Sequence, residues 1–397
     1  MDHRLLAAAA LTALAACAST PPTDETPPPA AAAPTDTGDI AEPAEGQGAT
    51  ASTTSRAILD RYAPNPSRGS TINYELIDEA LDVVVFNAGP STRRPAPRLE
   101  AGVGSRQRKG HDSRFRLEGN KIFFSQFDDA TETAISDYRQ SLEAIGRSVD
   151  ITTLARNEQL AYWINLHNLV VIDEISQRYP TRFPRRLKIG EERAAFHDAK
   201  LIDLGGPEKL SLRDVREIVS THWSDPRVIY GFFRGDVGGP SIRSQAYTGA
   251  NVGERLDRQA REFVNSLRGV SSGRTKAYVS EIYDEARPHH FADWPGALRA
   301  HLREHADEEV TAILDKTTGI AFGQYDERIA DLAGGEPGSD IRGGTVSSPG
   351  IPPTMVRIVD EYREKLQTLR REGRLKPKVI LIDVPTDDPD EDDGEVQ

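Results

Sequence analysis

Residues 154–180, LARNEQLAYWINLHNLVVIDEISQRYP, are the stretch around which the rest of the chain must be arranged. The stretch is apolar over most of its length and ends at Pro180, which cannot continue a helix. Its large apolar residues lie broadly along one sector of a helix: Leu160, Trp163, Leu166, Val170 and Ile172. Such a pattern predicts a long buried helix with Trp163 in the core.

Three polar side chains interrupt this apolar run: Asn165, His167 and Asn168. A buried amide without a partner costs about 1–3 kcal/mol, so these groups must have a reason to be there. One interpretation is that they pin neighbouring backbone. The other is that they line a functional site together with Trp163.

The other elements predict an α+β fold, a helix-rich single domain with a small sheet, because helices outnumber strands and no βαβ alternation appears. Ser211 and Asp214 have the spacing of a capping box, and Gly146 and Gly269 suit helix ends. Helices are expected at 72–86, 130–146, 210–223, 251–269, 295–314 and 354–373, and strands at 119–124, 227–233 and 276–283. The last helix has an apolar stripe that we expect to dock on the body or on a partner: Val356, Val359, Tyr362, Leu366 and Leu369.

A glycine-rich loop, RGDVGGPS, follows the expected strand RVIYGFF at residues 234–241. Its glycines can bring backbone N–H groups close to an anion, and Arg234 and the nearby Arg243 can pair with carboxylate or phosphate. It can equally be a plain turn. The candidate binding residues here are Arg234, Asp236, Gly238, Gly239, Ser241 and Arg243.

The order and spacing of these segments resemble the bacterial and plant family called domain of unknown function 547. AYWINLHN, SLRDVREIV, RVIYGFF and GGPSIRSQAYTG carry the resemblance, which covers roughly residues 74–325. It implies a fold distantly like that of papain-like or transglutaminase-like thiol hydrolases.

The chain departs from the family pattern where a thiol enzyme would need its reactive groups. Many relatives have His at the position of Ile229 and Cys at those of Arg234 and Gly239, and Glu-His often stands where this chain has Arg216 and Glu217. A thiolate nucleophile needs sulfur and a base that lowers its pKa. Cysteine catalysis is therefore excluded.

The string HLREH offers a different chemistry, because His301 and His305 share one helix face and Glu304 could act as a base. A zinc hydrolase also needs a third ligand; Asp307 and Glu308 are too close along the helix, but His289 and His290 could contribute by folding back. The other interpretation is that the pair flanks the apolar stripe of the helix. We expect no cofactor and no metal, and keep zinc at His301 and His305 as the alternative.

The first residues, MDHRLLAAAALTALAAC, have an apolar run that suits a signal-peptide core and is too short to span a bilayer. LAAC resembles the bacterial lipobox, whose Cys is lipidated after cleavage, and Cys17 is the single cysteine of the chain. We therefore expect a signal peptide at 1–16, a lipidated Cys17 with a disordered tether at 17–70, the body at 71–335, a linker and helix at 336–380, and a disordered acidic tail at 381–397.

The net charge of −13 is concentrated in that tail, so the body is only mildly acidic and nucleic-acid binding is not expected. The sequence predicts a protein of the bacterial cell envelope, anchored in the outer membrane and facing the periplasm. Its domain is expected to bind an envelope polymer, a peptide or another protein without catalysis. The alternative is an envelope hydrolase that uses His and carboxylate residues.

Overall fold

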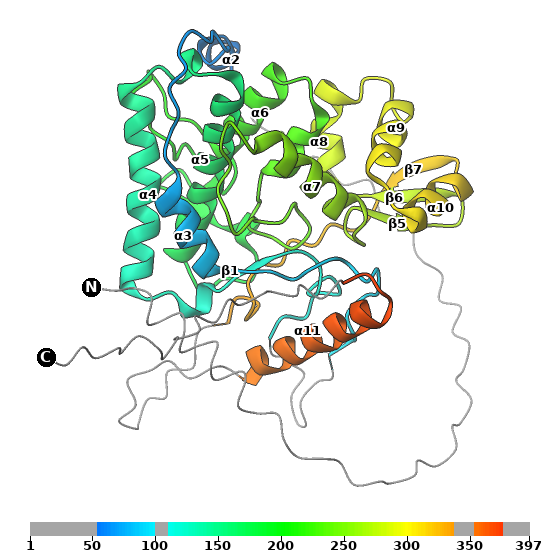
Figure 1. Cartoon of the computed structure of the whole chain (residues 1–397). Coiled ribbons are helices and arrows are strands. Elements are labelled where there is room, and N and C mark those ends of the chain that lie inside the picture. The colour runs from blue at the N-terminus through cyan, green and yellow to red at the C-terminus, as the bar shows by residue number, and fades with distance from the viewer. Residues whose placement is uncertain (1–53, 100–109, 337–352, 376–397) are drawn as a thin grey trace, which may run out of the picture.

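The computed structural model describes residues 54–99, 110–336 and 353–375, and it is the helix-rich α+β fold that the sequence predicts (Figure 1). The strands form small sheets. β1 pairs antiparallel with β2, and β3 antiparallel with β4. In the larger sheet β6 is central, antiparallel to β5 and parallel to β7.

The elements have the following bounds. The α-helices are α2 (Arg56–Arg61), α3 (Glu75–Val84), α4 (Asp129–Ser148), α5 (Arg156–Ser176), α6 (Leu212–His222), α7 (Val252–Val264), α8 (Ile282–His290), α9 (Gly296–His305), α10 (Glu308–Lys316) and α11 (Pro353–Arg371). The 3-10 helices are η1 (Phe124–Gln126), η2 (Ile151–Thr153), η3 (Pro184–Arg186) and η4 (Pro226–Gly231). The strands are β1 (Val85–Phe86), β2 (Lys121–Ile122), β3 (Lys188–Ile189), β4 (Ala194–Ala195), β5 (Val270–Ser272), β6 (Lys276–Val279) and β7 (Gly319–Phe322).

Helix α5 is the buried centre of the body, as expected. Every residue from Glu158 to Ser176 is buried, and the helix packs against α4, α6 and α7. Trp163 is 1% exposed, and its ring meets those of Tyr62 and Tyr162 edge-on. The apolar run is therefore explained by packing on all sides.

Two predictions about helix ends can be compared with the structure. The capping box of α6 is present, because the Ser211 hydroxyl accepts from the Asp214 N–H while the Asp214 carboxylate accepts from the Ser211 N–H. The expected end of α4 at Gly146 is wrong, since the helix continues to Ser148. Gly146 is instead a contact point, where an added Cβ would lie 2.4 Å from the Tyr162 hydroxyl.

The expected strand at 227–233 is also wrong, because Pro226–Gly231 form the 3-10 helix η4. The Asp225 carboxylate caps its first turn by accepting from the Arg227 N–H, and Pro226 stands at its start. Val228, Ile229 and Tyr230 are apolar because they are buried among helices. The expected single helix at 295–314 is two helices, since Asp307 caps the start of α10.

The body begins earlier than the expected boundary at residue 71. Within the stretch assigned to the tether, α2 packs against α6, and Ile58 and Tyr62 are 4% and 8% exposed. The apolar residues of 54–62 thus belong to the core. Cys17, the signal peptide and the acidic tail lie outside the described residues.

The C-terminal helix α11 docks on the body (Figure 1). Of the expected stripe, Tyr362 and Leu369 are buried and Val359 and Leu366 are half-buried, but Val356 is 50% exposed. Met355 and Ile358 join the buried face and pack with Ala88 and Leu332. Polar contacts fix the helix as well. Lys365 Nζ donates to the carbonyl of Ala88 at 2.9 Å, and the Tyr362 hydroxyl donates to that of Arg116 at 2.7 Å.

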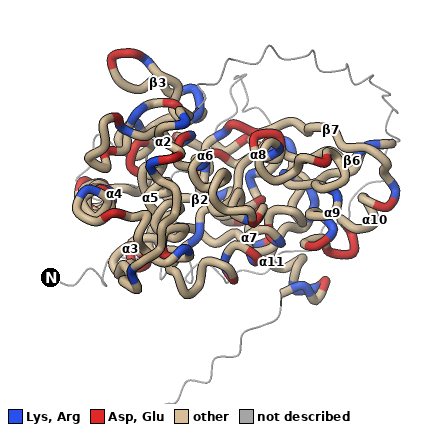
Figure 2. The backbone as a smooth tube through the Cα atoms, turned by 90° about the horizontal axis from the view of Figure 1, so that it is seen from above, with Lys and Arg blue, Asp and Glu red and all other residues tan. Residues whose placement is uncertain are grey.

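Lys and Arg are interspersed with Asp and Glu along the described chain (Figure 2). Within the described residues, no helix combines the length and the apolar character that crossing a bilayer requires.

Candidate functional site

The two asparagines of α5 hold both ends of the segment that contains the glycine-rich loop. Asn165 Nδ2 donates to the carbonyl of Tyr247 at 2.7 Å, and Asn165 Oδ1 accepts from the Tyr247 N–H at 2.9 Å. Asn168 does the same further along the helix, donating to Gly231 O and accepting from Phe233 N. The interpretation that these amides pin backbone therefore describes their contacts.

The glycine-rich loop lies in the interior beneath residues 326–330. Backbone bonds join Val237 N to Arg328 O, Gly238 N to Asp326 O and Ala330 N to Gly235 O. A Cβ on Gly238 would lie 2.8 Å from the Asp326 nitrogen, so this close approach of two backbones requires glycine. The Gly239 N–H donates to the Asp236 carboxylate. The N–H groups expected to form an anion nest are thus engaged within the protein.

Asp236 is the buried acid of this loop. Its Oδ1 accepts from the Tyr325 hydroxyl at 2.7 Å, and Arg185 Nε stands 4.0 Å from its Oδ2. Burial raises the pKa of Asp236 to about 7 despite the opposing effects of Arg185 and Tyr325. Asp236 thus has Tyr325 as its partner, and Arg234 turns elsewhere.

Ser241 is held between two charged residues. Arg268 Nη2 donates to its Oγ at 2.7 Å, and that Oγ lies 3.1 Å from a carboxylate oxygen of Glu262. Neither contact is with a histidine, so the hydroxyl is not arranged as an activated nucleophile.

Arg216 and Arg234 share one carboxylate. Arg216 Nε donates to Glu285 Oε1 and Arg234 Nη1 to Glu285 Oε2, both at 2.7 Å. The side chains of the two arginines are 5% and 4% exposed, and that of Glu285 is 30% exposed. Burial opposes ionisation of Glu285, but the two guanidinium groups outweigh it and hold the pKa of this carboxyl well below its usual range. We call these residues the Arg–Glu–Arg triad.

His167 of α5 adjoins the triad. Its Nε2 lies 3.1 Å from Arg216 Nη1, which can only donate, so Nε2 accepts and Nδ1 carries the proton. That proton points to Asn168 Oδ1 at 3.2 Å. Burial, followed by the charge of Arg216, lowers the pKa of His167 well below its usual value, which agrees with a neutral ring. Burial and the charges of Arg216 and Arg234 do the same to the pKa of His197.

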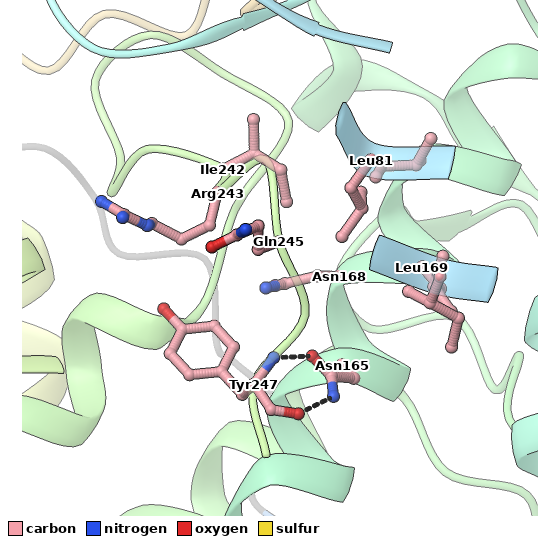
Figure 3. Close-up of a pocket in the computed structure, with 10 residues that line it drawn as sticks. Leu81, Asn165, Asn168, Leu169, Ile242, Arg243, Gln245 and Tyr247 are labelled. Atoms are coloured by element: carbon pink, nitrogen blue, oxygen red, sulfur yellow. Dashed lines mark hydrogen bonds between the residues drawn. The ribbon is translucent and has the colours of Figure 1, made fainter. Parts of the chain in front are cut away.

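A small pocket lies between α3, α5 and the segment 242–247 (Figure 3). Asn165 and Asn168 line it from α5, Leu81 lines it from α3, and Arg243 and Tyr247 come from the segment after the glycine-rich loop. Within the described part of the chain, the buried Arg243 Nε and the Tyr247 hydroxyl have no hydrogen-bond partner. Two unpaired donors thus occur on one pocket.

The structure distributes the expected site residues over four places. Asn165, Asn168 and Arg243 meet at the pocket, while Arg234 belongs to the triad, which His167 adjoins. Trp163, Gly238 and Gly239 serve the core and the backbone contacts. His301 and His305 lie apart on α9, where His301 Nε2 meets the Tyr230 hydroxyl at 2.9 Å.

Sequence reasoning missed Glu285, His197 and Tyr247. Glu285 stands 51 positions after Arg234, and no local pattern connects the two. The sequence did hold one indication: Arg234 directly follows the apolar run IYGFF. A guanidinium buried there requires a carboxylate partner somewhere in the fold.

The comparisons with known proteins agree with this arrangement. The family model described as "Protein of unknown function, DUF547" matches residues 151–264, which include α5, α6, η4, the glycine-rich loop and α7. The chain thus carries a DUF547 domain over this segment. Neither the curated proteins nor the solved structures include a match to it.

Proposed function

We propose that this protein is a lipid-anchored component of the bacterial cell envelope whose DUF547 domain binds a ligand without cysteine chemistry. The ligand is an envelope polymer, peptide or protein that presents hydrogen-bond acceptors, such as a carboxylate or a peptide carbonyl.

The observation that supports binding is the pocket of Figure 3. Arg243 Nε and the Tyr247 hydroxyl are donors without partners among the described residues, although a buried donor left unpaired costs about 1–3 kcal/mol. Gln245, exposed beside them, receives two bonds from Arg255 and so brings a second cation to the pocket. Two cations and a hydroxyl suit an acceptor-rich group. The pocket is small, so it fits an end group of a larger ligand.

The triad favours binding over cleavage. The family resemblance implies Cys in many relatives where Arg234 stands, and often Glu-His where Arg216 and Glu217 stand. Here two arginines and Glu285 fill that region, and each arginine donates a hydrogen bond to Glu285. This arrangement contributes charge pairing and holds α6, α8 and the loop together, and it offers neither a nucleophile nor a titratable base.

The lipid anchor rests on the sequence LAAC and on Cys17 being the single cysteine of the chain. An exported protein with one cysteine has no disulfide partner within its own chain. Lipidation would explain why the residue is a cysteine. The proline- and alanine-rich residues after it provide a tether.

The test uses the chain from residue 18 to 397 and a panel of purified peptidoglycan, soluble muropeptides and envelope proteins. Binding to one component should weaken about tenfold in Arg243→Gln, as expected when one charged hydrogen bond is lost. Arg258→Gln is the control, because it makes the same substitution at an exposed arginine that pairs with Glu254 on α7. Equal binding by wild type and Arg243→Gln would refute the pocket. Hydrolysis of a component that Arg243→Gln abolishes would refute the non-catalytic function.

A further inference from the structure

We propose that His301, Glu304 and His305 of α9, with Asp257 of α7, form a binding site for a divalent transition-metal ion of the zinc class. The site is separate from the ligand pocket, and its existence does not depend on the proposed function.

The geometry of α9 brings the ligand atoms together. His301 and His305 are one helical turn apart, and their ring centroids lie 4.9 Å from each other. One ligand atom from each of His301, Glu304 and His305 falls within 4.8 Å of the others. A single ion that bonds to nitrogen and oxygen at about 2.0–2.2 Å can bridge atoms at such separations after small rotamer changes.

The imidazole nitrogens are available. Both His301 and His305 are buried, at 6% and 1% exposed. Among the described residues, neither ring nitrogen of His305 nor the Nδ1 of His301 has a hydrogen-bond partner. Burying an imidazole with both nitrogens unpaired costs free energy. Bonds from these nitrogens to a metal ion would offset that cost.

The second nitrogen of His301 is oriented in the way that metal-ligating histidines are. His301 Nε2 lies 2.9 Å from the Tyr230 hydroxyl, which lies 3.1 Å from the Tyr283 hydroxyl. With the ring neutral, a proton on Nε2 that is donated to Tyr230 leaves the Nδ1 lone pair free.

Carboxylates at the rim supply the remaining ligands. Glu304 is exposed, and Asp257 Oδ1 lies 3.6 Å from His305 Nδ1. Arg261 Nε contacts the other oxygen of Asp257 at 3.0 Å, and Arg227 Nη1 lies 3.9 Å from Oδ1. An ion must therefore compete with two partly exposed guanidinium groups, of which that of Arg227 is also held by Asp225.

This donor set selects the class of ion. Two imidazoles and carboxylate oxygens are borderline ligands, which suit zinc and similar transition metals rather than calcium or magnesium. Because Asp257 lies on α7 and Tyr230 on η4, the ion would fasten α9 to the segment that leads into the glycine-rich loop.

The test titrates zinc chloride into the chain from residue 18 to 397, followed by calorimetry. This chain keeps every described residue and has no thiol, so no cysteine competes for zinc. We expect one saturable site, a higher melting temperature with zinc that EDTA reverses, and visible absorption of four-coordinate Co²⁺. His305→Gln should weaken zinc binding by more than about 100-fold, and Tyr230→Phe by about tenfold, in the range of residues that orient a ligand.

Two variants keep the test decisive if His305→Gln fails to fold. Glu304→Gln changes an exposed side chain, and Asp257→Asn keeps the shape of the residue; each should weaken binding by at least about tenfold if it removes a ligand. His289→Gln is the control, because His289 pairs with Glu217 away from the site. No saturable zinc binding by the wild type, or equal binding by wild type, Glu304→Gln and Asp257→Asn, would overturn the site and leave the two histidines as core residues.

Discussion

The side-chain amide of Asn165 pairs with both backbone polar groups of Tyr247, 82 positions away in the sequence (Figure 3). A side-chain amide presents a donor and an acceptor in the same arrangement as an edge of peptide backbone. Asn165 therefore takes the role of a neighbouring strand, and it fixes where the segment after the glycine-rich loop meets α5.

Asn165→Leu should lower the free energy of unfolding by about 2 kcal/mol or more, because it leaves the N–H and C=O of Tyr247 unpaired in the interior. Urea denaturation measures this loss. The control is Asn87→Ala, since Asn87 is exposed and accepts one bond from Gly89 N. Equal losses in the two variants would contradict the role of Asn165.

Trp163→Ala should cost about 3–5 kcal/mol, because it removes a large buried ring and leaves a cavity between Tyr62 and Tyr162. Leu76→Ala is the comparison, since Leu76 is 61% exposed and its truncation should change stability by less than about 0.5 kcal/mol. A cost below about 1 kcal/mol for Trp163→Ala would show that α5 is not the centre of the core.

Glu285→Gln should destabilise the fold by about 2 kcal/mol or more, since it leaves Arg216 and Arg234 buried without a counter-charge. Glu254→Gln removes an exposed partner of Arg258 and should cost at most about 1 kcal/mol. A double variant, Glu285→Gln with Arg234→Gln, should lose less than the sum of the two single losses, because the residues are coupled. Additive losses would argue against the triad as a unit.

Asp236 makes stability depend on pH. Its folded pKa of about 7 lies above the usual 3.8, so the folded state binds its proton more tightly than the unfolded chain does. The protonated acid thus contributes stability that is fully present below about pH 4 and is lost as the pH rises through about 7. Asp331, whose pKa burial raises to about 6, acts in the same direction.

Asp236→Asn isolates this contribution, because the amide oxygen can still accept from Tyr325 and Gly239 but cannot ionise. Relative to the wild type, the variant should gain stability between pH 5 and pH 8, as measured by thermal melts. Parallel stability curves for the two proteins across that range would refute the assignment.

Cys17→Ser should release the protein from membranes or leave it unprocessed, because two or more acyl chains at about 0.8 kcal/mol per buried methylene hold a lipoprotein firmly. Membrane fractionation of cells that express either form measures this. Ala18→Ser, which keeps the cysteine, is the control. Normal processing and membrane retention of Cys17→Ser would show that the cysteine carries no lipid.

The sequence predicts what depends on neighbours in the chain. The capping box of Ser211 and Asp214 and the burial of α5 follow from local spacing and from apolar content. The segment 227–233 shows the limit of this reasoning, because Val228, Ile229 and Tyr230 are as suitable for a strand as for a buried 3-10 turn. Asp225, which caps the first turn, and Pro226, which stands at its start, favour the 3-10 helix.

Long-range pairings were beyond sequence reasoning. Arg234 was expected to serve a ligand, but its charge is met by Glu285 of α8. Asn165 and Asn168 were rightly suspected of pinning backbone, yet only the fold shows that the backbone is that of residues 231, 233 and 247.

The packing of residues 326–330 over the glycine-rich loop has a consequence for how the protein folds. The family match ends at residue 264, but the loop inside it hydrogen-bonds to residues 326–330. The loop precedes these partners by about 90 positions in the chain, and its backbone groups stay hydrated until residues 326–330 pack on them. The segment that the family model recognises is therefore shorter than the length of chain needed to close the interior of this domain.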